Sequence, residues 1–415
     1  MHAAALVCLS LCACSAPPGR TESPPASPSV NSAASASSVP SATPSSSQRQ
    51  AQRLPGRAAI LRLEPHALPG LTEPGITTLI DLVEGDDPLL AKTCNGLSGD
   101  TELRCVSNAS LGQNTPIELR SEHVTLTVSV GERAEPLQLL RSRRWSAAAK
   151  EGVPGVATDW LIALDVSSSM GPRLDDARTI VEAQLATARP GDRFSLVFFN
   201  DREVVFSSPW TKDVAVARAA LRDRATPTVS TTRNRSLASI LDRVAEGLAK
   251  PSAGSSGEAA PLSRVMMVLS SGSGASGSEE LKRSLMLQAR LTKGEIGPTS
   301  PTAPRTPTPL IAVWLPVPAP EEQLANARDG MSRLANPDVG GRFILARKDA
   351  DFGAMLAKVL RERLNSMWLV EWQAPPCAKP GARQSFMLSF SPDEQILGDG
   401  SVRDVELSVA GCKER

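Results

Sequence analysis

The sequence has no tyrosine and only three histidines among 415 residues, His2, His66 and His123. The chain after residue 123 therefore cannot contain a Ser-His-Asp triad, and it lacks the phenol that some enzymes use as an acid or base. It also lacks a Gly-x-Ser-x-Gly elbow, a phosphate loop ending in Gly-Lys-Ser/Thr and a His-Glu-x-x-His zinc helix. These absences predict a protein that is not an enzyme, with a hydrolytic enzyme as the less favoured alternative.

The charge is nearly balanced, with 45 Lys and Arg against 44 Asp and Glu and a formal net charge of +1. No basic run stands out, so the sequence gives no sign of a nucleic-acid surface. Beyond the first residues, no segment has the unbroken apolar length of a membrane-spanning helix.

The first fourteen residues look like an export signal. The apolar run over 3–13 is too short to span a bilayer, but it has the length of a signal-peptide core. Its end, Leu11-Cys12-Ala13-Cys14, is similar to the lipobox of bacterial lipoproteins, in which the last Cys is acylated. The resemblance implies Cys14 as a lipid anchor in the cell envelope, and Ser15 after it favours the outer membrane or a periplasm-facing position. The segment before the run holds only His2 and neither Lys nor Arg, which indicates a true start further upstream or a weak signal. The alternative is an ordinary apolar leader with incidental cysteines.

Residues 15–55 consist mainly of Ser, Pro and Ala, with almost no large apolar side chains. Such a segment cannot bury enough surface to offset the entropy of ordering it. We therefore expect a disordered tether between the anchor and the folded part of the chain.

Four cysteines lie beyond the leader: Cys94, Cys105, Cys377 and Cys412. An even number in an exported chain indicates disulfides, and four cysteines allow three pairings. We favour Cys94 with Cys105 and Cys377 with Cys412, because each pair falls within one short β-like region. Four reduced, buried thiols are the alternative.

The region from 157 to 364 alternates apolar strands with amphipathic helices. Strands without polar alternation, separated by helices, predict an α/β fold: a doubly wound, mostly parallel sheet with helices on both faces. The strands expected here cover 160–164, 194–199, 204–206, 264–269, 310–315 and 342–345. Ligands bind such sheets at the carboxyl ends of the strands.

One polar motif lies at that edge. The first apolar strand ends in Asp165, and hydroxyls follow at alternate positions in Ser167 and Ser169. A carboxylate and two hydroxyls that face one point are hard oxygen ligands of the kind that Mg²⁺ or Mn²⁺ prefers. The alternative is a Ser-rich turn in which Asp165 caps the next helix.

This motif, with the turn at 190–192 before the strand at 194–199 and the order of elements after it, resembles a von Willebrand factor type A domain. The resemblance covers about half of the chain. It implies a metal-ion-dependent adhesion site in which an Asp, two Ser, a later Thr and a second Asp hold a divalent ion. A carboxylate of the partner often completes the coordination of that ion. Asp165, Ser167 and Ser169 match the first three positions.

The other two positions match less well. Thr232 is the candidate for the Thr, with Thr231 and Ser236 as rivals. Ser271 stands where the second Asp belongs, so we expect a weakened magnesium site or none. Asp201 or Glu279 could replace the missing charge if its loop reaches the site.

Alternating strand patterns flank the central domain, in an N-terminal region at 56–148 and a C-terminal region at 365–415. Each region alone has few strands with which to close a core. We therefore expect them to pair into one β-sandwich into which the central domain is inserted. The alternative is two separate β modules.

Together these features predict an exported, lipid-anchored binding protein that recognises another protein or a surface polymer. In the leading mechanism an acidic group of the partner meets a divalent ion, Mg²⁺ or a similar cation, at Asp165, Ser167 and Ser169. The alternative is a metal-free scaffold for assembly at the envelope.

Overall fold

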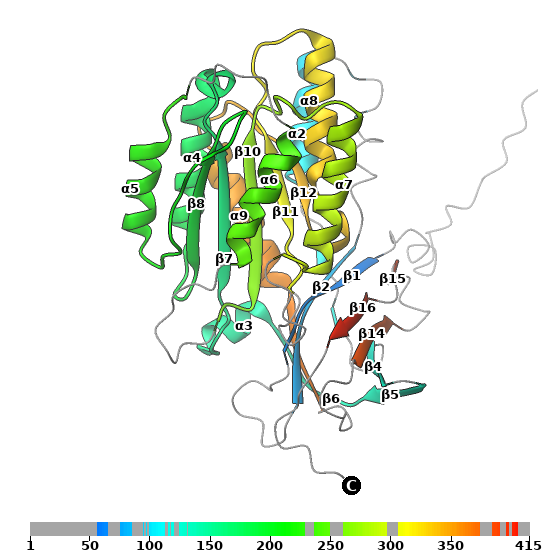
Figure 1. Ribbon diagram of the computed structural model, residues 1–415. Coiled ribbons are helices and arrows are strands. Elements are labelled where there is room, and N and C mark those ends of the chain that lie inside the picture. The colour runs from blue at the N-terminus through cyan, green and yellow to red at the C-terminus, as the bar shows by residue number, and fades with distance from the viewer. Residues whose placement is uncertain are drawn as a thin grey trace, which may run out of the picture. The chain divides into compact units, whose positions relative to one another are not determined.

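The computed structural model describes residues 56–64, 75–84, 94, 97, 99–112, 115–116, 118–119, 124–130, 132–228, 236–249, 260–296, 306–373, 384–390, 396–397 and 401–405 (Figure 1). The predictions for Cys14, the 15–55 tether, Thr232, Cys377 and Cys412 lie outside the described residues. No helix within these ranges has the length and apolar character needed to cross a membrane.

A six-stranded sheet forms the centre of the inserted domain, and five of its strands run parallel. The sixth, β9, pairs antiparallel with β8 at one edge. This confirms the predicted α/β class. In spatial order the strands are β12 (Arg342–Leu345), β11 (Leu310–Trp314), β10 (Ser263–Ser270), β7 (Thr158–Asp165), β8 (Arg193–Phe199) and β9 (Val204–Ser207).

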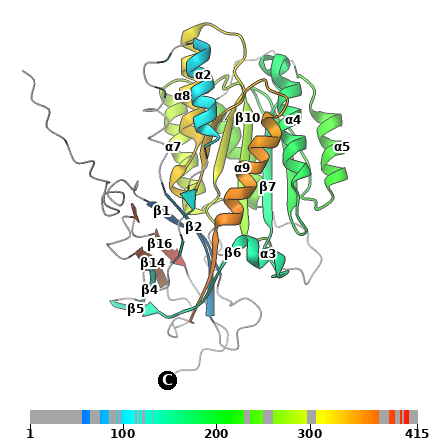
Figure 2. The ribbon, with the colours of Figure 1, turned by 180° about the vertical axis from the view of Figure 1, so that it is seen from behind.

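Helices cover both faces of this sheet because successive strand side chains point to opposite sides. Along β7, Trp160 and Ile162 join one hydrophobic cluster, whereas Leu161 and Ala163 join the other. The first cluster includes α4 (Leu174–Ala186), α5 (Val214–Arg224) and α9 (Phe352–Ser366). The second includes α6 (Leu237–Ala245), α7 (Ser278–Lys293) and α8 (Glu321–Leu334). Figure 1 is seen from the side of α6 and α7, and Figure 2 from the side of α9. Short 3₁₀ helices lie at η4 (Ser168–Arg173), η5 (Glu246–Ala249) and η6 (Pro337–Val339).

The two flanking regions share their sheets, as expected for one sandwich. The first sheet has the order β15 (Ile396–Leu397), β1 (Gly56–Glu64), β2 (Gly75–Glu84), β13 (Trp368–Gln373) and β6 (Leu139–Arg144), with β3 (Thr115–Pro116) paired to β2. The second has the order β16 (Ser401–Val405), β14 (Gln384–Phe390), β4 (Val124–Val130) and β5 (Arg133–Leu137). Side chains from both sheets, including Ile80, Leu126, Trp372 and Phe386, form one hydrophobic cluster. Two separate modules are therefore wrong.

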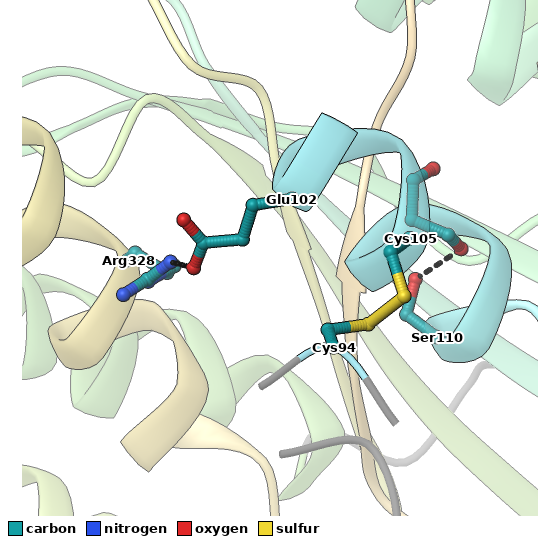
Figure 3. The surroundings of a disulfide bond; sticks show 6 residues. Cys94, Glu102, Cys105, Ser110 and Arg328 are labelled. Atoms are coloured by element: carbon teal, nitrogen blue, oxygen red, sulfur yellow. Dashed lines mark hydrogen bonds and ion pairs between the residues drawn. A yellow bond between two sulfur atoms is a disulfide. The ribbon is translucent and has the colours of Figure 1, made fainter. Parts of the chain in front are cut away.

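The N-terminal flank also contains a helix that the strand pattern did not predict. Cys94 and Cys105 form the expected disulfide, with their Cα atoms 5.7 Å apart, but Cys105 lies on α2 (Gly99–Ser110) and not in a β-like region (Figure 3). The helix packs against β12, where Ser107 Oγ donates to the Leu345 carbonyl at 2.8 Å. Glu102 pairs with Arg328 of α8 at 2.9 Å. These tertiary contacts, together with the packing of Leu103 and Val106 against the second hydrophobic cluster, stabilise the helix.

The inserted domain joins the sandwich through two neighbouring strands. β6 leads through α3 (Trp145–Lys150) towards β7, and α9 leads directly into β13. The strands β6 and β13 pair antiparallel, with Arg144 opposite Trp368. The Trp145 N–H donates to the Met367 carbonyl at 2.8 Å, so the entry and exit of the domain are hydrogen-bonded to each other.

Candidate functional site

Asp165 lies at the carboxyl end of β7, between β8 and β10. Its side chain is only 3% exposed, yet both carboxylate oxygens accept hydrogen bonds. The Ser167 N–H donates to Oδ1 at 2.9 Å, and Ser270 Oγ donates to Oδ2 at 2.7 Å. Two hydrogen bonds allow the carboxylate to be buried, because a buried polar group without partners would cost free energy.

Burial raises the pKa of the Asp165 carboxyl above its ordinary value. Hydrogen bonds from Ser167 and Ser270 act in the opposite direction, and the charge of Asp201 raises the pKa further. No Lys or Arg of the described residues forms an ion pair with Asp165. The surroundings therefore leave its negative charge without a positive partner.

The predicted hydroxyls gather beside this carboxylate. Ser167 Oγ lies 2.8 Å from Ser169 Oγ, and Ser169 Oγ lies 3.3 Å from Ser271 Oγ. Ser169 is brought back towards the strand end because η4 begins at Ser168, directly after the extended backbone of Ser167. Four of the five residues predicted from the sequence thus lie together, and Ser271 joins the cluster through its hydroxyl.

Sequence reasoning missed Ser270 as a direct partner of Asp165. The register of β10 against β7 pairs Leu269 with Leu164, which places Ser270 beside Asp165. The apolar runs of the two strands end at Leu164 and Leu269. Aligning these ends in parallel would have placed Ser270 beside Asp165. The Ser270 Oγ also accepts from the Gly272 N–H at 3.0 Å and so orders the turn after the strand.

Thr228 is a second residue that the sequence did not indicate. Its N–H donates to the Val166 carbonyl at 2.7 Å, and its side chain accepts from Asn200 Nδ2 at 3.3 Å. These bonds hold the loop after β8 and the segment before α6 against the Asp165 turn. Thr228 therefore positions the backbone of the site.

The turn after β10 is held on its far side by α8 and β11. Trp314 Nε1 donates to the Ser271 carbonyl at 2.9 Å. Gly272 has φ of +76°, and a Cβ at this position would lie 3.0 Å from both Ala327 Cβ and the Ala327 carbonyl oxygen. A glycine is required here for both the backbone angle and the close approach of α8.

Of the two acids considered as substitutes for the second Asp, only Asp201 acts on the site. It follows β8, its charge raises the pKa of Asp165, and its Oδ1 is buried without a hydrogen-bond partner among the described residues. Glu279 instead pairs with Arg283 at 2.8 Å.

Ser236, a rival for the Thr position, is engaged elsewhere. Its hydroxyl contacts Glu280 Oε2, and the Ala238 N–H donates to Glu280 Oε1 at 2.8 Å. Burial raises the pKa of the Glu280 carboxyl, and the hydrogen bonds from Ser236 and Ala238 partly offset this rise. Glu280 and Ser236 therefore cap the beginning of α6.

The oxygen cluster fits a weak site for a hard divalent cation. Mg²⁺ binds through one or two carboxylates and keeps several waters, and hydroxyl oxygens suit it. Asp165 supplies one carboxylate, and the unpartnered oxygen of Asp201 adds negative charge nearby. The described residues contain no group of three or more His, Cys, Asp or Glu side chains that could hold a metal ion. A cation at this position would therefore depend on Ser167, Ser169, Ser271 and water.

Residues 160–272 match the family profile of the von Willebrand factor type A domain. The matched segment begins in β7 and ends in the turn after β10, so it includes both parts of the oxygen cluster. The chain thus contains a von Willebrand factor type A domain, as its Asp165 motif predicted. No curated protein matches the sequence.

Three solved structures illustrate the structural likeness. An aerotolerance-related membrane protein from Bacteroides fragilis is 15% identical, with 51% of this chain and 100% of that chain covered and a TM-score of 0.34. A von Willebrand factor type A protein from Catenulispora acidiphila is 11% identical, with 69% and 73% covered and a TM-score of 0.35. The pilus adhesin SpaC from Lactobacillus rhamnosus GG is 10% identical, with 82% and 53% covered and a TM-score of 0.34.

Proposed function

We propose that this protein is an exported, lipid-anchored binding protein and not an enzyme. In this proposal its von Willebrand factor type A domain holds a divalent cation and recognises an acidic group on a protein or surface polymer. The observation that carries the proposal is the convergence of Ser167, Ser169 and Ser271 hydroxyls beside Asp165, a buried carboxylate without a cationic partner among the described residues.

Each residue has a distinct part in the proposed mechanism. Asp165 supplies the charge that attracts the ion, and Ser167 and Ser169 supply neutral oxygens. Ser271 supports a bound water, since it lacks the carboxylate that would attract the ion directly. A bound cation would supply an electrophilic centre for the partner's carboxylate. Because this chain contributes little negative charge, the acidic partner would contribute more to cation affinity than in a site with two aspartates.

The second candidate is a metal-free scaffold that uses the same edge for assembly at the envelope. It is favoured by the two internal hydrogen bonds that already occupy Oδ1 and Oδ2 of Asp165. In this case Asp165 orders the turn, and a cation is not needed.

Calorimetric titration of the full-length chain with MgCl₂ and MnCl₂ separates the two candidates. We expect binding with a dissociation constant of about 1 mM or tighter for the wild type and none for Asp165→Ala. Asp175→Ala is the matched control, because Asp175 is an exposed acid on α4 whose ion pair among the described residues is with Arg178 of the same helix. Absence of heat with both metals, in a chain whose circular dichroism shows it folded, would support the scaffold.

The partner is sought by affinity capture with the tagged protein, with and without a chelator. Under the cation mechanism, the chelator and Asp165→Ala release the same partner, whereas Asp175→Ala retains it. A partner that stays bound in both cases contradicts the proposed mechanism. The anchor is tested separately: Cys14→Ser should move the protein from the membrane fraction to the soluble fraction.

A further inference from the structure

A cavity of about 770 Å³ lies at the other end of the central sheet. Its walls come from α3 and the loop after it, from the turn at 189–193, from Lys212, from Pro261 and from the end of α9. These segments meet the amino ends of the strands, since Ala157 directly precedes β7 and Arg193 begins β8. The volume falls in the range of small-molecule and peptide-side-chain sites, about 300–1,000 Å³.

The cavity combines apolar walls with a positive charge. Val153, Val156 and Pro190 contribute apolar surface, and the lining also includes the basic residues Lys150, Arg189, Arg193 and Lys212. Among the described residues that line it there is no Asp or Glu. Arg193 is neutralised from β7, because Asp159 accepts from it at 2.7 and 2.8 Å.

Arg189 has no such acid. The neighbouring carboxylate, Asp192, is already engaged: Oδ1 accepts from the Thr158 N–H at 2.9 Å, and Oδ2 accepts from Arg361 at 2.7 Å. No carboxylate of the described part of the chain pairs with the Arg189 guanidinium. Burial and the nearby charge of Arg361 lower the pKa of Arg189, and the charge of Asp192 acts in the opposite direction.

Asn365 provides an independent polar group in the same cavity. It lies near the end of α9 and lines the cavity, and its Oδ1 is buried without a hydrogen-bond partner among the described residues. A buried acceptor without a donor is energetically unfavourable. A ligand with an N–H group could satisfy this acceptor.

We propose that this cavity binds an acidic peptide segment whose carboxylate meets Arg189 and Lys150. A peptide combines the three features that the cavity requires: a carboxylate for the basic groups, a backbone N–H for Asn365 and apolar side chains for the Val and Pro walls. The site is separate from the Asp165 cluster, because the two lie at opposite ends of the parallel strands.

Saturation-transfer difference NMR with acetyl-Leu-Glu as the probe tests the proposal on the full-length chain. We expect a dissociation constant of about 1 mM or tighter, which rising salt weakens. Arg189→Gln should weaken binding at least about tenfold, because it removes the charged donor. Asn365→Asp should have a similar effect, since it places a competing carboxylate in the cavity. Lys282→Gln, an equal charge change at an exposed position of α7, should change binding less than about twofold.

Four results would overturn the proposal. One is equal binding of the neutral probe acetyl-Leu-Gln-amide, and another is equal binding by Arg189→Gln and Lys282→Gln. Inorganic phosphate that displaces the probe at equal concentration would show a site for simple anions instead of a peptide. The probe should bind equally with and without a chelator. Loss of probe binding in the chelator would assign the signal to the Asp165 site, and failure of the metal titration alone would leave this cavity site standing.

Discussion

Asp165 and Asp192 lie at opposite ends of the same parallel sheet, and each residue is 3% exposed. Their partners differ. Asp165 accepts hydrogen bonds from Ser167 and Ser270 and has no cationic partner among the described residues, whereas Asp192 is tied to the guanidinium of Arg361 at 2.7 Å. At equal burial, the compensating group decides what a carboxylate can do. Asp192 is a structural anchor, and Asp165 keeps a charge that can attract a cation.

The largest loss of stability should come from removing Asp192, the carboxylate that pairs with Arg361. Asp192→Ala leaves Arg361 buried without its carboxylate and removes the acceptor of the Thr158 N–H. We expect a loss of about 3–5 kcal/mol in the free energy of unfolding, measured by urea denaturation. Asp175→Ala, at an exposed acid, should change it by less than about 1 kcal/mol. Similar losses in both variants would mean that the buried pair does not anchor this end.

The next largest loss of stability should come from removing a hydrogen bond to Asp165. Ser270→Ala removes the donor to Asp165 Oδ2 and the acceptor of the Gly272 N–H. Because a buried carboxylate oxygen then lacks its partner, we expect a loss of about 1–3 kcal/mol by the same measurement. Ser332→Ala is the control, since that hydroxyl is exposed and bonds only within α8. A Ser270→Ala variant as stable as the control would show that Asp165 does not need this bond.

Glu280 is a second buried acid near the carboxyl ends of the strands, and its raised pKa predicts how stability depends on pH. Burial raises its pKa in the native state, so the native state holds the proton more tightly than the unfolded chain does. The free energy of unfolding should therefore fall as the pH rises from the ordinary pKa of glutamate through the native pKa. Glu280→Gln should remove this decline, because Gln keeps an acceptor for the Ala238 N–H and carries no charge. If the free energies of unfolding of the wild type and of Glu280→Gln changed equally from about pH 4 to pH 7, the expectation would be wrong.

The smallest effect on stability should come from Asp165→Asn. The amide keeps the shape and one acceptor for the Ser167 N–H, and it removes a buried charge that has no counter-charge. We expect a change below about 1 kcal/mol in the free energy of unfolding, together with complete loss of cation binding in calorimetry. If Asp165→Asn lost as much stability as Asp192→Ala, the two carboxylates would not differ in their structural role.

The sequence predicted the residues at the Asp165 end of the sheet better than those at the cavity end. Asp165, Ser167 and Ser169 lie within five residues on one strand end, so a short motif contains their geometry. Ser270 required the register between two strands about a hundred residues apart. The cavity has no local signal at all, because Lys150, Arg189 and Asn365 come from separate segments that only the fold brings together.

The flanks show the same limit. Alternation of apolar and polar residues predicted β2, β4 and β14, since half-buried strands have a period of two. It missed α2, which has few apolar residues and which contacts β12 through Ser107 and Ser110 and α8 through Glu102. The disulfide of Cys94 with Cys105 was predicted because both were expected in one short β-like region; the pairing is confirmed, although Cys105 lies on α2.

The insertion of the central domain has a consequence for the order of folding. The sandwich pairs β2 with β13, and Thr78 Oγ1 donates to the Val370 carbonyl across 292 positions of the chain. Closing so long a loop of unfolded chain is entropically costly and slow. Once the central domain has folded, however, Trp145 and Met367 are already hydrogen-bonded neighbours, and the effective loop between the two flanks becomes very short. We therefore expect the central domain to fold before the sandwich, whose sheets need the last strands of the chain.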